Sequence, residues 1–387
     1  MRSVLASIIV VGLVALMLFA PRAAAAGRPV IYSKWTSSPP TIDGNFLTGE
    51  PWTSSLQITM LEPSFPVTSY VYMLNDNTNL YVLVDAVDDH TSTAGDASLL
   101  VFDFTHQFRY KVVDQSGFVW NSVSFSYVAY SGAVGGFGAS PSPNGDVNHR
   151  IYEFKIPLSD IDTQAGQVVD FSAPTGLKGS SIVYDDSTTR DNIWPSGLNV
   201  GDITTWGLLA TSTQIATATG STAIFASTGG FSSGPTASAL SSVSPAPPAG
   251  LTFPYGLFSF IIGEYPPGTT VYVTITLPSP LPAGSFSYWK FQSGAWTQFS
   301  SASLEPTRTI ITLTFTADAS GMITDPGGPA ILTGPPPSAG PVGGAVEPVN
   351  KLTVIAPYLA VFGMVAAVAV IIVTDRKHGE LTNQSVS

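Results

Sequence analysis

The chain has 387 residues, no cysteine and a formal net charge of −11. The lack of cysteine excludes disulfide bonds and thiolate metal sites. The negative charge argues against binding to nucleic acid or to an anionic membrane surface, because both need a positively charged protein face.

The N-terminus has the pattern of a secretory signal peptide. Arg2 supplies a positive charge, an apolar segment covers residues 4–20, and small residues follow up to Gly27. We therefore predict a signal peptide over residues 1–26, cleaved after Ala26, and export of the residues that follow. An uncleaved membrane anchor is the alternative.

Residues 27–212 have the sequence pattern of a first β-sandwich domain. Short segments in which apolar and polar residues alternate are separated by Gly, Pro, Asn, Asp and Ser, which favours about ten strands. Residues 75–79 (NDNTN) predict a hairpin turn between two of these strands. The strands are expected at residues 68–74, 80–85, 98–104, 109–113, 122–130, 151–156, 168–172, 182–184 and 206–209.

A second strand series predicts a smaller β-sandwich over residues 213–333. Its first part, up to about residue 250, is rich in Ser, Thr, Ala, Gly and Pro. We interpret part of it as a linker, with a possible strand at residues 223–225. Further strands are expected at residues 257–262, 270–277, 286–292, 296–299 and 309–316.

The C-terminal region predicts a membrane anchor. Residues 334–350 form a Pro/Gly stalk, and the apolar segment 351–374 is long enough to cross a bilayer as a helix. Arg376 and Lys377 follow it, so the positive-inside rule places the tail, residues 375–387, in the cytoplasm. The predicted fold class is therefore all-β, with two β-sandwich domains and one C-terminal transmembrane helix. The predicted location is the cell membrane, crossed once, with the N-terminus and the bulk of the chain outside.

Several short motifs of the first domain occur in an order that is similar to one family. They are found at residues 41–44 (TIDG), 50–52 (EPW), 79–85 with 88–89, 152–158 (YEFKIPL), 194–195 (WP) and 206–207 (WG). In this order they resemble the family 9 carbohydrate-binding modules and their DOMON-like relatives. The resemblance implies a β-sandwich that binds sugars, is often appended to glycoside hydrolases and sometimes holds structural calcium.

The second domain resembles the choice-of-anchor U domain. The resemblance is carried by residues 253–260 (FPYGLFSF), 267–274 (PGTTVYVT) and 323–329 (ITDPGGP). It implies a position beside a C-terminal surface anchor and no particular chemistry.

Aromatic residues on polar loops are the candidates for sugar binding, because a pyranose ring stacks its C–H face on an aromatic ring. We expect Trp194 and Trp120 to contact ligand, with Tyr184 and Arg190 as a second face and a hydroxyl partner. Trp52 and Trp206 are expected in the core. Trp289 and Trp296 are expected in a core or an edge strand.

An acidic cluster in the first domain suggests calcium, which prefers several oxygen ligands. It consists of Asp85, Asp88, Asp89 and Asp96. A solvated turn is the alternative interpretation.

The predicted function is display of a sugar-binding β-sandwich on the cell surface without catalysis. The histidines lack metal-ligand spacing, and no Gly-x-Ser-x-Gly motif with a triad is present. The expected partners are carbohydrate or polysaccharide, the membrane, and possible surface-layer or envelope proteins, with no nucleic acid. One alternative is a structural or adhesive envelope protein without a soluble ligand. Another is a DOMON-type redox domain that binds haem through residues such as Met60, Met73 or His90.

Overall fold

The computed structural model describes residues 28–332 apart from residues 55, 63–64, 88, 91–95, 138–141, 146, 173–193, 196–197, 200 and 264. The predicted signal peptide, stalk, membrane span and cytoplasmic tail lie outside the described residues. Within the described part, no helix has the length and apolar character needed to cross a membrane.

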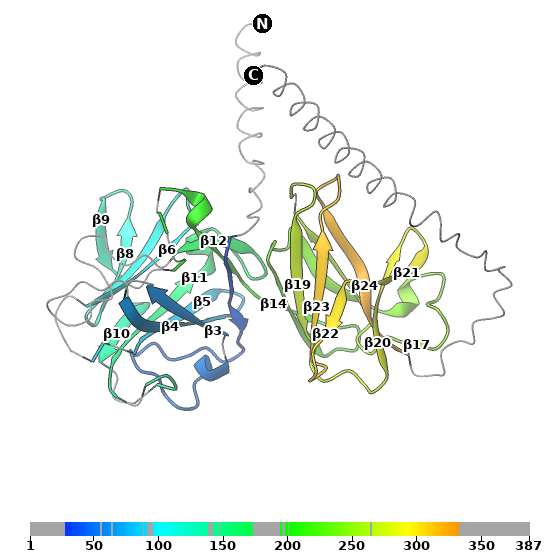
Figure 1. Cartoon of the computed structure of the whole chain (residues 1–387), viewed down its shortest axis with the longest axis horizontal. Helices are drawn as coiled ribbons and strands as arrows, with labels where there is room; N and C mark the ends of the chain where they lie inside the picture. Colours follow the sequence, from blue (N-terminus) through cyan, green and yellow to red (C-terminus); the bar gives the residue numbers. More distant parts are fainter. Residues whose placement is uncertain are drawn as a thin grey trace, which may run out of the picture. The chain divides into compact units, whose positions relative to one another are not determined.

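The regular elements of the described residues are strands and short 3-10 helices, which confirms the all-β prediction (Figure 1). The 3-10 helices are η1 (Pro51–Ser54), η2 (Leu158–Ile161), η3 (Ile203–Thr205) and η4 (Leu240–Ser242).

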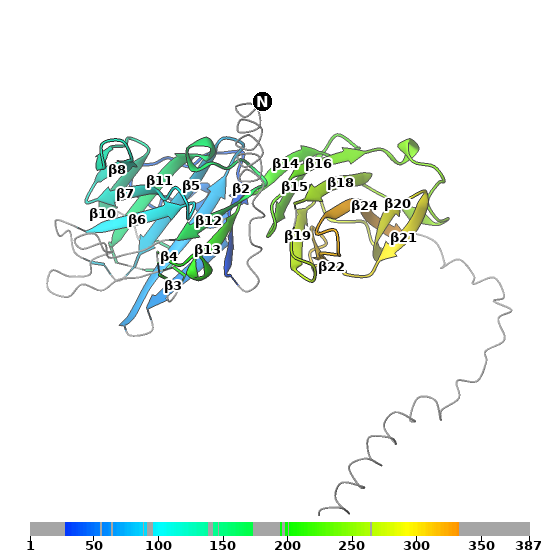
Figure 2. The same cartoon turned by 90° about the horizontal axis from the view of Figure 1, so that it is seen from above.

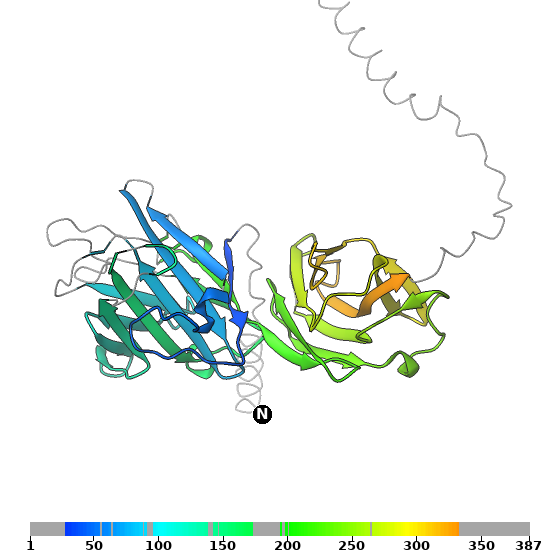
Figure 3. The same ribbon diagram turned by 90° about the horizontal axis from the view of Figure 1, so that it is seen from below.

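The first thirteen strands build two sheets. Sheet one has seven strands in the order β1 (Val30–Tyr32), β13 (Gly207–Ala210), β12 (Val168–Ser172), β6 (Ala97–Phe102), β7 (Phe108–Val113), β8 (Ser116–Asn121) and β9 (Ser126–Ala129). Sheet two has the order β10 (Ala133–Phe137), β11 (Arg150–Pro157), β5 (Asn79–Ala86), β4 (Phe65–Asn75) and β2 (Lys34–Trp35), with β3 (Leu56–Glu62) also paired to β4. Figure 3 shows strands of sheet two side by side, coloured blue to green.

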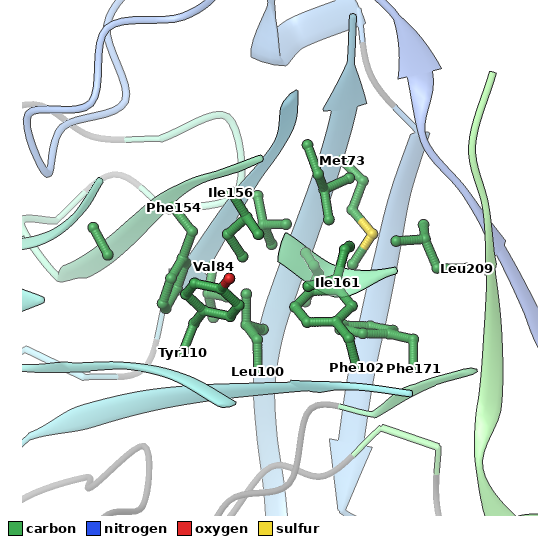
Figure 4. Packing of buried hydrophobic residues seen from close by; sticks show 14 of the residues in the cluster. Met73, Val84, Leu100, Phe102, Tyr110, Phe154, Ile156, Ile161, Phe171 and Leu209 are labelled. Atoms are coloured by element: carbon green, nitrogen blue, oxygen red, sulfur yellow. The ribbon is translucent and has the colours of Figure 1, made fainter. Parts of the chain in front are cut away.

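The two sheets pack face to face over one apolar core. Side chains from β4, β5 and β11 point toward side chains from β6, β7 and β12, as Figure 4 shows for Met73, Phe154, Phe102 and Phe171. Strict alternation puts every second residue of each strand into this core. Met73, one of the residues considered for haem, is therefore a core side chain with no exposed surface.

Sheet two is buried on its other face as well. Phe46 and Trp52 come from the segment before β3 and pack on Tyr72, Tyr81 and other residues that point away from the main core. This second layer explains why β5 is buried along nearly its whole length. It also confirms the expected core position of Trp52, which is completely buried.

The remaining strands form two further sheets. One has the order β14 (Thr213–Ala216), β15 (Thr222–Ser227), β19 (Thr270–Thr276), β23 (Ile310–Thr316) and β22 (Ala302–Leu304). The other has the order β16 (Ser233–Ser238), β18 (Leu257–Ile262), β24 (Ile323–Leu332), β20 (Ser285–Gln292) and β21 (Ala295–Phe299), with β17 (Leu251–Thr252) on β24 (Figure 2). A shared core that includes Phe225, Phe258 and Phe260 joins these two sheets.

The structure confirms the possible strand at 223–225 and corrects two details of the sequence prediction. Ala223 and Phe225 alternate into the core in β15, and β14 and β16 add strands to the region that was expected in part as a linker. The expected strand at 122–130 is interrupted, since residues 122–125 form a turn between β8 and β9. The side-chain Oδ1 of Asn121 accepts hydrogen bonds from the backbone N–H groups of Val123 and Ser124, at 2.9 and 3.0 Å, and so closes this turn.

Candidate functional site

Trp194 lies against the inner core of the first sandwich. Its ring centroid is 5.5 Å from that of Phe171, and a Cβ atom at Gly207 would lie 2.1 Å from the ring. The absence of a side chain at Gly207 is thus what makes room for the indole. The side chain is half-buried, and part of its surface is already used in packing. Its predicted neighbours Tyr184 and Arg190 lie outside the described residues.

Trp120 lies on the opposite face of sheet one, in strand β8. In the β7–β8 register Tyr110 pairs with Val119, and both point into the core. One step along, Arg109 and Trp120 therefore point outward. In the β8–β9 register Trp120 pairs with Tyr127, which brings that ring to the same outer face. The structure does not bring Trp120 and Trp194 together on one surface.

The outer face of this hairpin carries two aromatic rings and two cations. The Trp120 and Tyr127 rings meet edge to face, with centroids 5.2 Å apart. The Arg109 guanidinium lies 5.6 Å from the Trp120 ring centroid, and the Lys111 ammonium 5.3 Å from that of Tyr127. Cations at such distances are attracted to the ring faces. We call Arg109, Lys111, Trp120 and Tyr127 the β7–β9 face.

All four side chains of the β7–β9 face are half-buried, and burial affects their ionisation. Burial lowers the pKa of the Lys111 ammonium. Burial also raises the pKa of the Tyr127 hydroxyl, although the charge of Arg109 opposes this. Arg109 is oriented by Gln107, whose side-chain oxygen accepts a hydrogen bond from the guanidinium at 2.5 Å.

The hairpin turn beside this face exposes apolar side chains. Phe125 is 78% exposed and Val123 is 88% exposed, the two highest values among the large apolar residues of the described chain. Phe125 also has a φ of 49°, a left-handed conformation that is unfavourable for a bulky residue. Phe125 was not among the predicted site residues, because residues 122–127 alternate as a half-buried strand would. The signal that could have revealed the turn is Asn121 with Ser122 and Ser124 close behind it, because Asn and Ser favour turns.

The predicted calcium ligands are buried rather than solvated. Asp85, Asp89 and Asp96 have no exposed surface, so the alternative of a solvated turn is wrong for these three. Asp88 lies outside the described residues. The Asp96 carboxylate accepts from the Arg150 guanidinium at 2.9 Å, and the Asp89 carbonyl accepts from the backbone N–H of Arg150 at 3.0 Å.

Asp85 is paired with a histidine that the sequence analysis did not select. Its Oδ1 lies 2.5 Å from His149 Nε2, and its Oδ2 accepts from the Asn144 amide at 2.8 Å. The other ring nitrogen of His149 lies 2.6 Å from the Val147 carbonyl oxygen. Because both ring nitrogens face acceptors, this geometry suits the doubly protonated imidazolium.

The Asp85 carboxylate is thus directed at His149 and the Asp96 carboxylate at Arg150, while Asp89 contacts Arg150 through its backbone carbonyl. Among the described residues, a different group has the spacing of a metal site. Asp103, His106 and Asp162 each offer one ligand atom, and these atoms lie within 4.8 Å of one another. The side chains of His106 and Asp162 are exposed. Calcium binding by the Asp85 cluster stays a prediction.

Glu153, in strand β11, is a further buried acid of the first sandwich. Its Oε2 accepts from the backbone N–H groups of Asp43 and Gly44, both at 2.7 Å, and its Oε1 accepts from the Trp52 indole at 3.0 Å. Burial raises the pKa of Glu153 to about 8, against the lowering effect of the two backbone N–H groups.

The raised pKa values of His149 and Glu153 predict that the protein is less stable at alkaline pH. Burial lowers the pKa of His149, but the hydrogen bond and charge of Asp85 outweigh it, so the pKa lies above its ordinary value. A group whose pKa is raised on folding stabilises the protein below its unfolded pKa, and this stabilisation is lost as the pH rises through its folded pKa. For Glu153 the loss extends from its ordinary value of 4.5 to about 8, and for His149 it begins near 6.5.

Urea unfolding of the full chain at a series of pH values between about 5 and 9 measures this loss of stability. Each unit of pKa shift corresponds to about 1.4 kcal/mol in the free energy of unfolding. We expect the free energy of unfolding to decrease across this range. The Glu153→Gln variant, which cannot ionise there, should show a smaller decrease. A free energy of unfolding that increases from pH 5 to 9 would contradict the assignment.

Comparisons with known proteins return structures only. No protein-family model matches the chain, and no curated protein matches it. Two similar solved structures are of a carbohydrate-binding module family 9 from Caldicellulosiruptor kristjanssonii, one in complex with glucose and one with cellotriose. They are 17% and 16% identical, cover 46% of this chain and 94% and 92% of their own chains, and have a TM-score of 0.28. The resemblances to DOMON and choice-of-anchor U domains stay predictions.

Proposed function

We propose that the first sandwich binds carbohydrate through the β7–β9 face and the adjoining turn. The observation that carries this proposal is the gathering of Trp120, Tyr127 and the exposed Phe125 on one hairpin. Aromatic rings at a protein surface supply the apolar area on which the C–H face of a sugar ring stacks. Trp120 is also one of the residues that the sequence analysis selected for this role.

Phe125 strengthens the proposal. Leaving a phenylalanine 78% exposed in a left-handed conformation is unfavourable for folding. The turn that holds it is closed by Asn121, so the ring is presented before any ligand arrives. A preorganised ring loses little conformational freedom on binding.

We propose that this binding is not coupled to catalysis. The buried acid–histidine pair of the first sandwich, Asp85 with His149, has no exposed surface and is therefore out of reach of a substrate. The exposed His106 lies beside two carboxylates, Asp103 and Asp162, and the sequence offers no Gly-x-Ser-x-Gly motif with a triad. Display at the cell surface is part of the same proposal and is supported by the predicted signal peptide and C-terminal span. Weak single sites suit such display, because many copies on one membrane bind a polymer together.

A glycan array probed with the full chain in detergent tests the proposal. We expect the unmodified chain to bind a glycan and the Trp120→Ala variant to bind it at least tenfold more weakly. A tenfold loss of affinity corresponds to about 1.4 kcal/mol, which is typical for removal of a buried aromatic contact. Phe125→Ala should weaken it as well. Tyr272→Ala is the matched control, since Tyr272 is an exposed aromatic residue, 46% exposed, in strand β19. Circular dichroism should confirm that each variant is folded. Absence of binding to every glycan by the folded chain would favour the structural, adhesive alternative.

A further inference from the structure

We propose that the carbohydrate taken by the β7–β9 face is anionic, a polysaccharide that carries carboxylate or sulfate groups. This inference rests on the proposed function and specifies its ligand. It is drawn from the two cations of the face, Arg109 and Lys111, which lie two residues apart on strand β7.

These cations differ from other cations of the chain in what surrounds them. Arg28 pairs with Asp170 at 2.8 Å, Arg150 with Asp96 at 2.9 Å, and Lys290 with Asp325 at 3.3 Å. Among the residues that the structure describes, neither Arg109 nor Lys111 has a carboxylate within 4.0 Å. Two half-buried cations that are not in such ion pairs are notable in a chain whose net charge is −11. Their positive charge is available to a ligand.

The hydrogen-bonding character of the face points the same way. Arginine and lysine side chains donate hydrogen bonds and accept none. The hydroxyl groups of a neutral sugar are both donors and acceptors, so they are best matched by a mixture of carboxylates and amides. Carboxylate and sulfate groups accept only. A planar guanidinium matches a carboxylate with two parallel hydrogen bonds.

The rings and the cations are also spaced for one ligand. The Arg109 guanidinium lies over the Trp120 ring, 5.6 Å from its centroid, and the Lys111 ammonium lies over the Tyr127 ring, 5.3 Å from its centroid, so each ring has a cation over one face. A sugar that stacks near either ring would bring its substituents toward a positive charge. Lys111 is partly desolvated, and burial lowers its pKa, so an anion bound there would restore the interactions that the ammonium lost with water.

A matched pair of ligands gives the sharpest test. Oligogalacturonate and its methyl ester have the same sugar rings, but only the first is charged. We expect the full chain to bind the acid at least tenfold more tightly than the ester. If galacturonate is not the sugar, the same preference should appear for other uronate or sulfated oligosaccharides on an array that also carries neutral glycans. Binding of the acid should weaken with added salt, because exposed charges are screened.

Variants then assign the preference to the two cations. Arg109→Gln and Lys111→Gln should each reduce the affinity for the acidic glycan at least fivefold and reduce the weaker binding to the ester by a smaller factor, so that the preference for the acid falls. Lys155→Gln is the matched control, because Lys155 is an exposed lysine on strand β11 of the other sheet. Equal or tighter binding to neutral glycans, unaffected in both variants, would overturn this inference and leave the proposed function intact. Absence of binding to any glycan would overturn both.

Discussion

Replacement of His149 by alanine is expected to lower the free energy of unfolding by about 3–5 kcal/mol, the usual loss when one partner of a buried ion pair is removed. The Asp85 carboxylate would remain in a site with no exposed surface and would lose its cation. The Asn144 amide would still donate to its Oδ2, but a single neutral donor does not compensate a buried charge. Urea unfolding of the full chain, followed by tryptophan fluorescence, measures the loss.

His90 provides the matched control for this experiment. It is exposed, and its ring lies 3.4 Å from the Asn148 carbonyl oxygen. His90→Ala should change the free energy of unfolding by less than about 0.5 kcal/mol, as surface substitutions do. The double variant Asp85→Ala with His149→Ala should be less destabilised than the sum of the two single variants, because each residue depends on the other. Strict additivity would show that the pair is not coupled.

Much of the fold could be predicted because alternation along a strand directly reflects burial. Residues 80–85 and 151–156 were expected as strands, and they lie in β5 and β11. The turn at 75–79 was also confirmed, with Asp76 accepting from the backbone N–H groups of Thr78 and Asn79. In these places local preference and tertiary packing agree.

The candidate site could be predicted only in part, because it depends on which strands become neighbours. Trp120 was selected as an aromatic residue near a strand start, but nothing local indicates that Arg109 lies beside it. That contact follows from the pairing of β7 with β8. Trp194 was selected for its polar loop, yet its ring packs on Phe171 over the space left by Gly207. Pairing and close approach of distant segments are tertiary properties that the pattern of one segment does not contain.

The buried acids illustrate the same limit. A run of aspartates after a strand is equally consistent with a metal site, a solvated turn or a buried network. The structure decides against the solvated turn through His149 and Arg150, which are 64 residues from Asp85 and 54 residues from Asp96 respectively. Because such partners are far apart in the chain, their pairing could not be inferred from spacing.

Glu153 connects three of the motifs that carry the family resemblance. The motif at 41–44 supplies the backbone N–H groups of Asp43 and Gly44, the motif at 50–52 supplies the Trp52 indole, and the motif at 152–158 supplies the carboxyl group that accepts from all of them. Gly44 must be glycine here, since a Cβ atom would lie 2.6 Å from the backbone nitrogen of Gly136 and its φ is +79°. These motif residues therefore hold the segment before β3 against sheet two, a structural role separate from the β7–β9 face.

Glu153→Ala is accordingly expected to destabilise the first sandwich strongly and to leave the binding surface chemically unchanged. It leaves the Gly44 N–H and the Trp52 indole N–H buried without their acceptor, at about 1–3 kcal/mol each, so the free energy of unfolding should fall by about 2–6 kcal/mol. Glu153→Gln should lose less, because its single amide oxygen can still accept from Asp43 and Gly44 while its NH2 group opposes the indole donor. Urea unfolding measures both variants, and glycan affinity is compared under conditions where each is folded. Equal stability of Glu153→Ala and the unmodified chain would show that another group satisfies these donors.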